Sequence, residues 1–442
     1  MKKILVILLI LLNCNNLFSE EKTITQERKE TLLYGIDTQI KELLTQFKKE
    51  KTEGFEEELL TILNTTYDES IKSMIFDLFI DLEIKSGEME ALKIIDAIEY
   101  EEDFNDSYAI ACLNYLSEIN SEKAIQKVEF LLDNDNKSVI SSTLKLIGNN
   151  KVKKTEDTLL NMLDKDDTDD TLYVLIIKTL GEIESQKALE KFTPILNDED
   201  EETSVRTAVC YSLGEIGDPK SIPVLKNALQ NRTNYLLRKS ALEALTKFTF
   251  VELDDILIAT LKDNQWQLRE AAIKSLGERK VEKAFEILKY KANNDPEAKI
   301  KKSALQAIGD INSDECRDYL KEIFLDDKAP ESSRLVASDK LIEHNVDWIY
   351  PSLENMFNEK NGEKKKPVLD YTLKLFSEKK YNYGSNLLVK LLNHENFVYQ
   401  IYGIKGIGLN KFTEHKEKIK ELSENSKNNS VKKNALTVLE TL

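Results

Sequence analysis

Carboxylates recur at one position of a repeating pattern, and among the residues of this sequence they have the clearest capacity for ionic chemistry. Each directly follows a residue, often glycine, that returns every 31 to 35 residues from Ser117 onward. The members of this acidic row are Glu118, Glu182, Glu215, Glu278, Asp310, Glu343 and Glu378. Side chains held in register would form a ridge that attracts a basic segment of a partner.

The same row has a second interpretation. Lys178, Lys274 and Lys374 each lie four residues before a member of the row, a spacing that lets a lysine neutralise a carboxylate on one helix. The row would then be a solvated, lysine-paired edge. We keep both interpretations and take Glu182, Glu215, Glu278, Asp310 and Glu343 as candidate partner-binding residues.

Aromatic residues become frequent toward the C-terminus, and two of them, Tyr381 and Tyr383, stand in the polar turn "KKYNYGSN". Tyrosine is a favoured anchor at protein interfaces, so these two are further candidates for partner binding. The sequence has only three histidines and no P-loop, GxSxG or HExxH motif. We therefore expect no catalytic residue, no metal site and no cofactor.

The elements that carry these residues are pairs of helices. The repeated residue is Gly148, Gly181, Gly214, Gly277, Gly309 and Gly408 in the clearest copies. Apolar residues recur at helical spacing before and after it, which predicts an inner helix that ends near the glycine and an outer helix beyond a polar turn. In the copy around Gly214, we expect Ser204 to cap the inner helix and Pro223 to lie in the first turn of the outer one.

Apolar residues four and one positions before the repeated residue form two rows that we expect to be the buried seam. One helix pair cannot bury its apolar face alone, so the pairs must stack on one another. The stretch "SVRTAVCYSLGEIGDPKSIPVLKNAL" also resembles the HEAT-repeat family, in its short PBS-lyase-like form, and Val205, Arg206, Leu213, Asp218 and Pro219 match the family pattern. The resemblance is clearest over residues 137–345.

This resemblance implies an all-α fold, an α-solenoid or HEAT-like superhelix of about twelve helix pairs, over residues 31–442. It implies that the inner helices line the concave face, where the acidic row would lie. It also favours Asp–Arg pairs between repeats as the role of the basic residues at the start of the inner helices, such as Arg206, Arg269 and Arg334, over a ligand-binding arginine row.

The start of the chain has the form of an export signal, because Lys2 and Lys3 precede an apolar run from Ile4 to Leu12. Two processing sites compete. A signal peptide over residues 1–19 would end before Glu20, whereas a lipoprotein signal over residues 1–13 would leave Cys14 to carry a lipid. Residues 20–30 would be a polar linker. Either route predicts an extracytoplasmic protein, periplasmic or lipid-anchored in the cell envelope.

The formal net charge of −17 excludes nucleic acid as a partner, because phosphate binding needs basic stripes. Cys112, Cys210 and Cys316 lie far apart within helical patterns, so we expect small buried residues rather than redox or metal groups. Together these features predict a non-catalytic scaffold or adaptor that binds a protein partner, one with a basic segment, along the solenoid groove. The alternatives are a ligand carrier or lyase-like enzyme built on HEAT repeats, and a structural spacer.

Overall fold

The computed structural model describes residues 24–100, 104–165, 169–250, 252–344, 348–360, 366–380 and 385–442. Throughout these ranges the secondary structure consists of α-helices and short 3-10 helices, without a strand. The expected signal segment, Cys14, Tyr381 and Tyr383 lie outside the described residues. The chain divides into two compact units, an N-terminal unit up to Phe248 and a C-terminal unit from Thr249.

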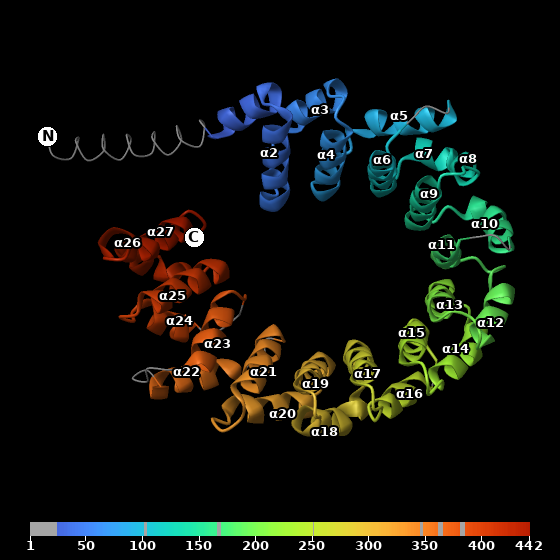
Figure 1. The fold of residues 1–442 in the computed structure, drawn as a ribbon. Coiled ribbons are helices and arrows are strands. Elements are labelled where there is room, and N and C mark those ends of the chain that lie inside the picture. The colour runs from blue at the N-terminus through green and yellow to red at the C-terminus, as the bar shows by residue number, and fades with distance from the viewer. Residues whose placement is uncertain are drawn as a thin grey trace. The chain divides into compact units, whose positions relative to one another are not determined.

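In the N-terminal unit, inner helices stack on one another and outer helices connect them (Figure 1). The inner helices are α2 (Asp37–Glu50), α4 (Glu69–Asp81), α6 (Asp106–Glu118), α9 (Lys137–Asn149), α11 (Asp170–Glu182), α13 (Thr203–Ile216) and α15 (Tyr235–Thr246). The outer helices are α3 (Glu56–Thr65), α5 (Glu88–Glu99), α7 (Glu122–Gln126), α8 (Val128–Leu132), α10 (Glu156–Leu163), α12 (Leu189–Asn197) and α14 (Ile222–Leu229). The 3-10 helices η1 (Lys153–Thr155) and η2 (Pro219–Ser221) lead into α10 and α14.

The C-terminal unit repeats the arrangement. Its inner helices are α17 (Trp266–Glu278), α19 (Ala298–Ile311), α21 (Glu331–Glu343), α23 (Pro367–Ser377), α25 (Phe397–Asn410) and α27 (Asn429–Leu439). Its outer helices are α16 (Leu253–Thr260), α18 (Phe285–Asn294), α20 (Asp314–Leu325), α22 (Ile349–Lys360), α24 (Ser385–Leu392) and α26 (Lys416–Asn425), with the 3-10 helices η3 (Glu282–Ala284) and η4 (Thr413–His415). No helix in the described part of the chain is long and apolar enough to cross a membrane.

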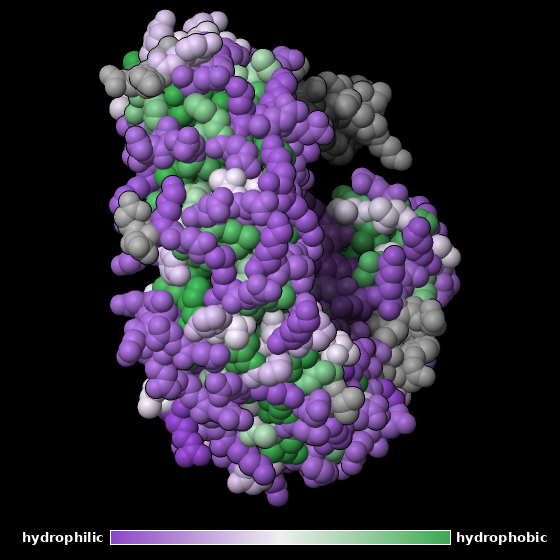
Figure 2. All heavy atoms as spheres, turned by 90° about the vertical axis from the view of Figure 1, so that its right-hand side faces the viewer, coloured by the Kyte–Doolittle hydropathy of each residue, from purple (hydrophilic) through white to green (hydrophobic). Residues whose placement is uncertain are grey.

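The two apolar rows form the buried seam, as predicted. The row directly before the repeated residue, from Leu116 to Ile407, is buried along its whole length. The row four positions before it is also buried, except for Leu436, which is 54% exposed in the last inner helix. On the face drawn in Figure 2, hydrophilic side chains form most of the surface and hydrophobic ones show in small areas between them. Burial along the seam therefore holds successive pairs together.

The repeated glycines let neighbouring inner helices approach closely. A Cβ atom at Gly277 would lie 2.9 Å from the Cα atom of Ala307, and one at Gly214 would lie 3.0 Å from the Cα atom of Ala244. These residues belong to the next inner helix in each case. Glycine is thus needed at these two positions because the backbone of the next inner helix leaves no room for a Cβ atom.

Buried arginines at the start of the inner helices hold the end of the preceding outer helix. Arg206 donates from Nε to the Leu196 carbonyl at 3.1 Å, and Arg334 donates to the Phe324 carbonyl at 3.0 Å. Their positive charge faces a helix C-terminus, where the helix dipole favours it. Arg334 also forms an ion pair with Asp327 at 2.8 Å, and Arg269 forms a two-bond ion pair with the buried carboxylate of Asp295. The expected structural role of these arginines is confirmed, and the Asp–Arg pair between repeats is found at Arg269.

Two local predictions differ from the structure, the cap of α13 and the polar linker, and one, the position of Pro223, is confirmed. Helix α13 begins at Thr203 with Glu202 as its N-cap, so Ser204 is not the cap. Residues 24–34 form a helix with Leu32 buried, so the stretch expected to be a polar linker is helical from residue 24. Pro223 lies in the first turn of α14, as expected.

The cysteines of the described chain agree with expectation as well. Cys112, Cys210 and Cys316 are free and completely buried in inner or outer helices. Burial raises the pKa of the Cys112 and Cys210 thiols to about 12. Both thiols therefore stay protonated and behave as small packing residues.

Candidate partner-binding site

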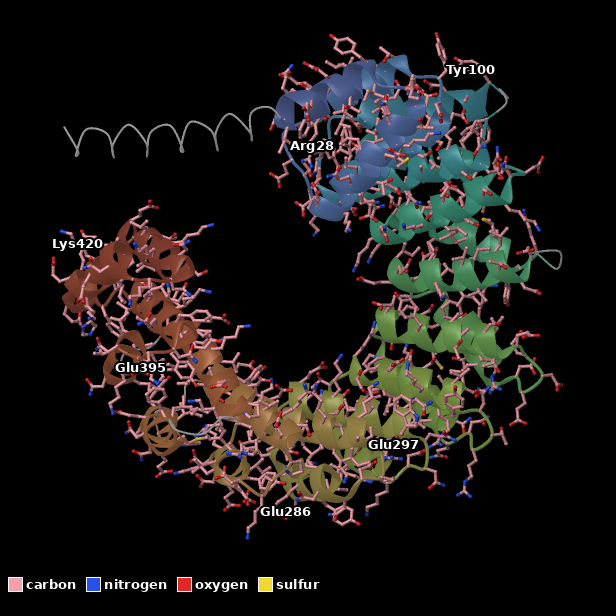
Figure 3. All side chains as sticks on the ribbon, turned by 60° about the vertical axis from the view of Figure 1, so that its left-hand side comes forward. Arg28, Tyr100, Glu286, Glu297, Glu395 and Lys420 are labelled. Atoms are coloured by element: carbon pink, nitrogen blue, oxygen red, sulfur yellow. The ribbon has the colours of Figure 1, made fainter. Side chains whose placement is uncertain are left out.

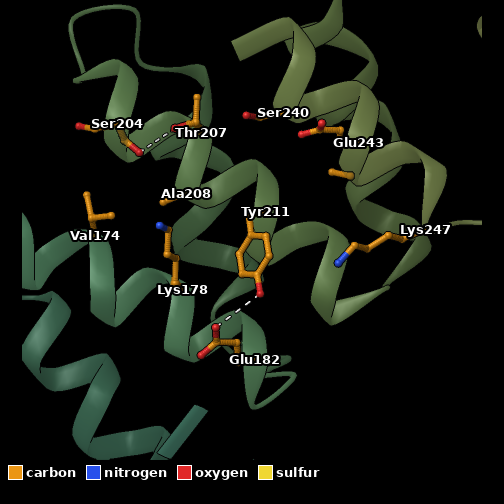
Figure 4. Close-up of a pocket in the computed structure, with 11 residues that line it drawn as sticks. Val174, Lys178, Glu182, Ser204, Thr207, Ala208, Tyr211, Ser240, Glu243 and Lys247 are labelled. Carbon is orange, nitrogen blue, oxygen red and sulfur yellow. Dashed lines mark hydrogen bonds between the residues drawn. The ribbon is translucent and has the colours of Figure 1, made fainter. Parts of the chain in front are cut away.

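Inner helices α11, α13 and α15 enclose an open hollow of about 530 Å³ in the N-terminal unit. Figure 4 shows Tyr211 of α13 at its centre, with Lys178 and Glu182 of α11 on one side and Lys247, at the end of α15, on the other. Residues seven and three positions before the repeated residue face this space, and so does the residue directly after it. These positions share the side of a helix opposite the seam. The acidic row is thus one part of a wider exposed stripe.

Tyr211 is the aromatic centre of this hollow and remains 37% exposed. Its hydroxyl donates to Oε1 of Glu182 at 3.4 Å, and Lys247 Nζ lies 5.2 Å from the ring centroid. Burial, together with the nearby charges of Glu182 and Glu215, raises the pKa of Tyr211 to about 12. The phenol is therefore a neutral hydrogen-bond donor attached to a partly exposed apolar ring.

Glu182 is half-buried at the base of the hollow. Burial raises the pKa of its carboxyl, the neighbouring Glu215 raises it further, and Tyr211 and Lys178 offset part of the shift. The carboxylate lies against Gly148, where an added Cβ atom would come within 1.9 Å of Oε2. Among the described residues Glu182 has no ion-pair partner, so it is a partly desolvated carboxylate that only the charge of Lys178 offsets in part.

Other members of the acidic row are neutralised within the chain. Lys247 forms an ion pair with Glu215, and Lys340 lies 2.5 Å from Asp310 and 2.8 Å from Glu343. The bond from Lys340 lowers the pKa of Glu343. For Glu215 and Asp310 the lysine comes from the next inner helix and not from four residues earlier on the same helix. Lys178, four residues before Glu182 on the same helix, lowers the pKa of that carboxyl as expected, but it forms no ion pair with it among the described residues.

A second hollow, of about 400 Å³, lies between α17, α19 and α21 of the C-terminal unit. Lys274 and Glu278 line it at the positions that Lys178 and Glu182 occupy in the first hollow. Glu278 is exposed, and within the described part of the chain no lysine or arginine pairs with it. Of the five acidic candidates, Glu182 and Glu278 are therefore the two that can accept a cation from a partner.

Tyr211 is the residue of this site that sequence reasoning missed. It lies three positions before the repeated residue, where the other inner helices carry polar side chains such as Asn114, Lys145, Lys178 and Gln306. The sequence signal that could have identified Tyr211 is that it is an aromatic residue at a position where these other repeats carry polar ones. The structure holds no cluster of three or more potential metal ligands among the residues it describes.

The sequence matches the model of the spirochaete HEAT repeat proteins over residues 32–438. The chain belongs to this family. The family match confirms the predicted HEAT-repeat α-solenoid and extends it over both flanks of the region where the repeats are clearest. A search of curated proteins gave no match to this HEAT repeat protein.

Several solved structures resemble this HEAT repeat protein. The crystal structure of the karyopherin Kap121p has a TM-score of 0.43 and 14% identity, with 93% of this chain and 52% of the karyopherin covered. The complex of CpcE and CpcF of phycocyanin lyase from Nostoc sp. PCC7120 has a TM-score of 0.32 and 19% identity, with 53% of this chain and 94% of that one covered. The chain spans about half the length of the karyopherin.

Proposed function

We propose that this HEAT repeat protein is a non-catalytic scaffold of the cell envelope that binds a protein partner through the hollows of its inner helices. The observation that carries the proposal is the combination at the first hollow of a partly exposed Tyr211 with a half-buried Glu182 that forms no ion pair among the described residues. A basic side chain of a partner would meet the carboxylate while its aliphatic part packs on the ring. Glu278 offers a second acidic contact in the C-terminal unit.

The location is supported by the sequence of the first residues alone. Two lysines precede the apolar run from Ile4 to Leu12, and the mature chain would begin at Cys14 or Glu20. Mass spectrometry of the protein from fractionated cells tests this part. An intact Met1 on protein from the cytoplasmic fraction would refute the envelope location without touching the binding site.

The binding site is tested by crosslinking and co-purification from envelope extracts. The parent chain should retain a defined partner, and Tyr211→Ala should lose most of it, because a buried aromatic anchor at an interface is worth about 2 kcal/mol or more. Tyr290→Ala is the matched control, since Tyr290 is 61% exposed on α18, away from the inner helices. Equal retention by Tyr211→Ala and the parent would place the partner elsewhere.

A further inference from the structure

Three tyrosines of the N-terminal unit are regularly spaced in the sequence and lie near the ends of three helices. Tyr34, Tyr67 and Tyr100 are separated by 33 residues each and are 81%, 99% and 76% exposed. Tyr34 ends the helix over residues 24–34, Tyr67 follows α3, and Tyr100 is the C-cap of α5. Each therefore lies at or just after the end of a helix that precedes an inner helix, and Figure 3 shows Tyr100 at the margin of the ribbon.

The fold does not use these side chains. Within the described part of the chain, none of the three rings packs on another ring or a cation, and none of the hydroxyls forms a hydrogen bond. In several later repeats the C-cap of the outer helix is an aspartate, as in Asp133 of α8 and Asp198 of α12, and in α14 it is Gln230. Large exposed rings at a turn where a small polar residue suffices indicate an interaction surface.

A carboxylate follows each tyrosine in the sequence, at the start of the next inner helix, and Lys41 and Lys127 pair with Asp68 and Glu99 beside the second and third. The carboxylates that begin the inner helices are Asp37, Glu69 and Asp106 in turn. Ile36, next to the first tyrosine turn, is 67% exposed and adds apolar area. We call this row of Tyr34, Tyr67 and Tyr100 the tyrosine edge. An apolar row bordered by carboxylates complements a partner that carries apolar residues between basic ones.

The period of the edge selects the conformation of that partner. Stacked helices lie roughly 8–10 Å apart, so successive tyrosines repeat at about that distance. Seven residues of an α-helix rise about 10.5 Å and return to nearly the same side of the helix. In an extended strand, residues three apart also span about 10 Å but lie on opposite faces. A helix therefore meets all three rings from one side.

We infer that the tyrosine edge docks an amphipathic helix of a partner protein, with apolar residues about seven apart and basic residues beside them. This surface is separate from the inner-helix hollows, so it goes beyond the proposed function. Three aromatic contacts supply the affinity, and the carboxylates set the orientation of the helix.

Site-specific photo-crosslinking of the full chain tests this inference. Tyr34, Tyr67 and Tyr100 are each replaced by p-benzoylphenylalanine in cells of the source organism, and Tyr290 serves as the exposed control on another element. We expect all three positions to crosslink one polypeptide, at points in sequential order and about seven residues apart. The combined Tyr34→Ser, Tyr67→Ser and Tyr100→Ser variant should lose that polypeptide, whereas Tyr211→Ala should keep it at this edge.

Three results would overturn the inference. The three positions could crosslink no more than the Tyr290 control does, or crosslink only lipid, which would assign the edge to a membrane surface. Crosslinked points about three residues apart would assign it to a polyproline segment, whose turn rises about 9 Å. Since the readout at the tyrosine edge does not depend on Tyr211 or Glu182, its failure leaves the proposed function unaffected.

Discussion

At the scale of single residues, equivalent carboxylates differ according to which lysine the next repeat supplies. Glu215 has Lys247 and Asp310 has Lys340, whereas Glu182 and Glu278 have no such partner among the described residues. The row itself could be predicted from the sequence, because its spacing is regular. The pairing could not, since it depends on a side chain about 30 residues away and on the rotation of one helix against the next.

Replacing Glu182 with glutamine should stabilise the folded chain at neutral pH. Burial raises the pKa of this carboxyl, so its stabilising contribution is present at pH values below the unfolded pKa of about 4.3 and is lost as the pH rises through the folded pKa. In chemical denaturation, the midpoint of Glu182→Gln should exceed that of the parent at pH 7.5 and match it near pH 4. Glu286→Gln, at an exposed position of α18, should change neither. A lower midpoint for Glu182→Gln at pH 7.5 would show that the carboxylate is already compensated.

Replacing Gly277 with alanine tests the close approach of α17 and α19 through the sign of the change in unfolding free energy. In an unobstructed helix the change stabilises by about 1 kcal/mol, because alanine is the better helix former. Here the new Cβ would meet the backbone of Ala307 at 2.9 Å, so we expect a net loss of about 1–3 kcal/mol in unfolding free energy. Lys274→Ala on the same helix is the control and should stay within about 0.5 kcal/mol of the parent. A stabilised Gly277→Ala protein would contradict the close approach of α17 and α19.

At the scale of elements, the helix pairs and their seam could be predicted because burial follows the apolar period closely. Leu436 in α27 departs from it, because its side chain is 54% exposed. Tyr211 was not predicted, because packing does not constrain the residue types of the exposed stripe and Tyr211 is an exception in a series of polar residues. The ends of helices could not be predicted to the residue from the apolar period. Helix α13, for example, begins at Thr203, one residue before the expected cap.

The junction between α17 and α19 contains two ion pairs of different kinds, which allows a matched comparison. Arg269→Met would leave the buried carboxylate of Asp295 with Lys291 alone, and we expect a loss of about 3 kcal/mol. Lys299→Met breaks an exposed pair with Glu270 and should cost at most about 1 kcal/mol. Denaturation midpoints of the two variants measure the difference. Equal losses would show that Arg269 is not required between these repeats.

At the scale of the whole molecule, this member of the spirochaete HEAT repeat proteins presents two kinds of surface. The inner-helix hollows combine carboxylates with a tyrosine, and the tyrosine edge repeats an aromatic ring along one margin of the N-terminal unit. Neither surface contributes to the buried seam. A scaffold can therefore vary both without loss of stability, because its fold depends on the seam, the glycines and the buried arginines.

The most direct test of the central claim is the affinity of the co-purified partner for a chain with Glu182→Lys and Glu278→Lys together. Exposed pairs contribute about 0–1 kcal/mol each, so we expect binding about tenfold weaker at low salt, with a smaller difference as salt rises. Helicity should match that of a Glu286→Lys control, which should bind as the parent does, and affinities are compared at a temperature where every variant is folded. If the double reversal binds the partner as tightly as the parent at low salt, the inner-helix hollows are not the binding surface.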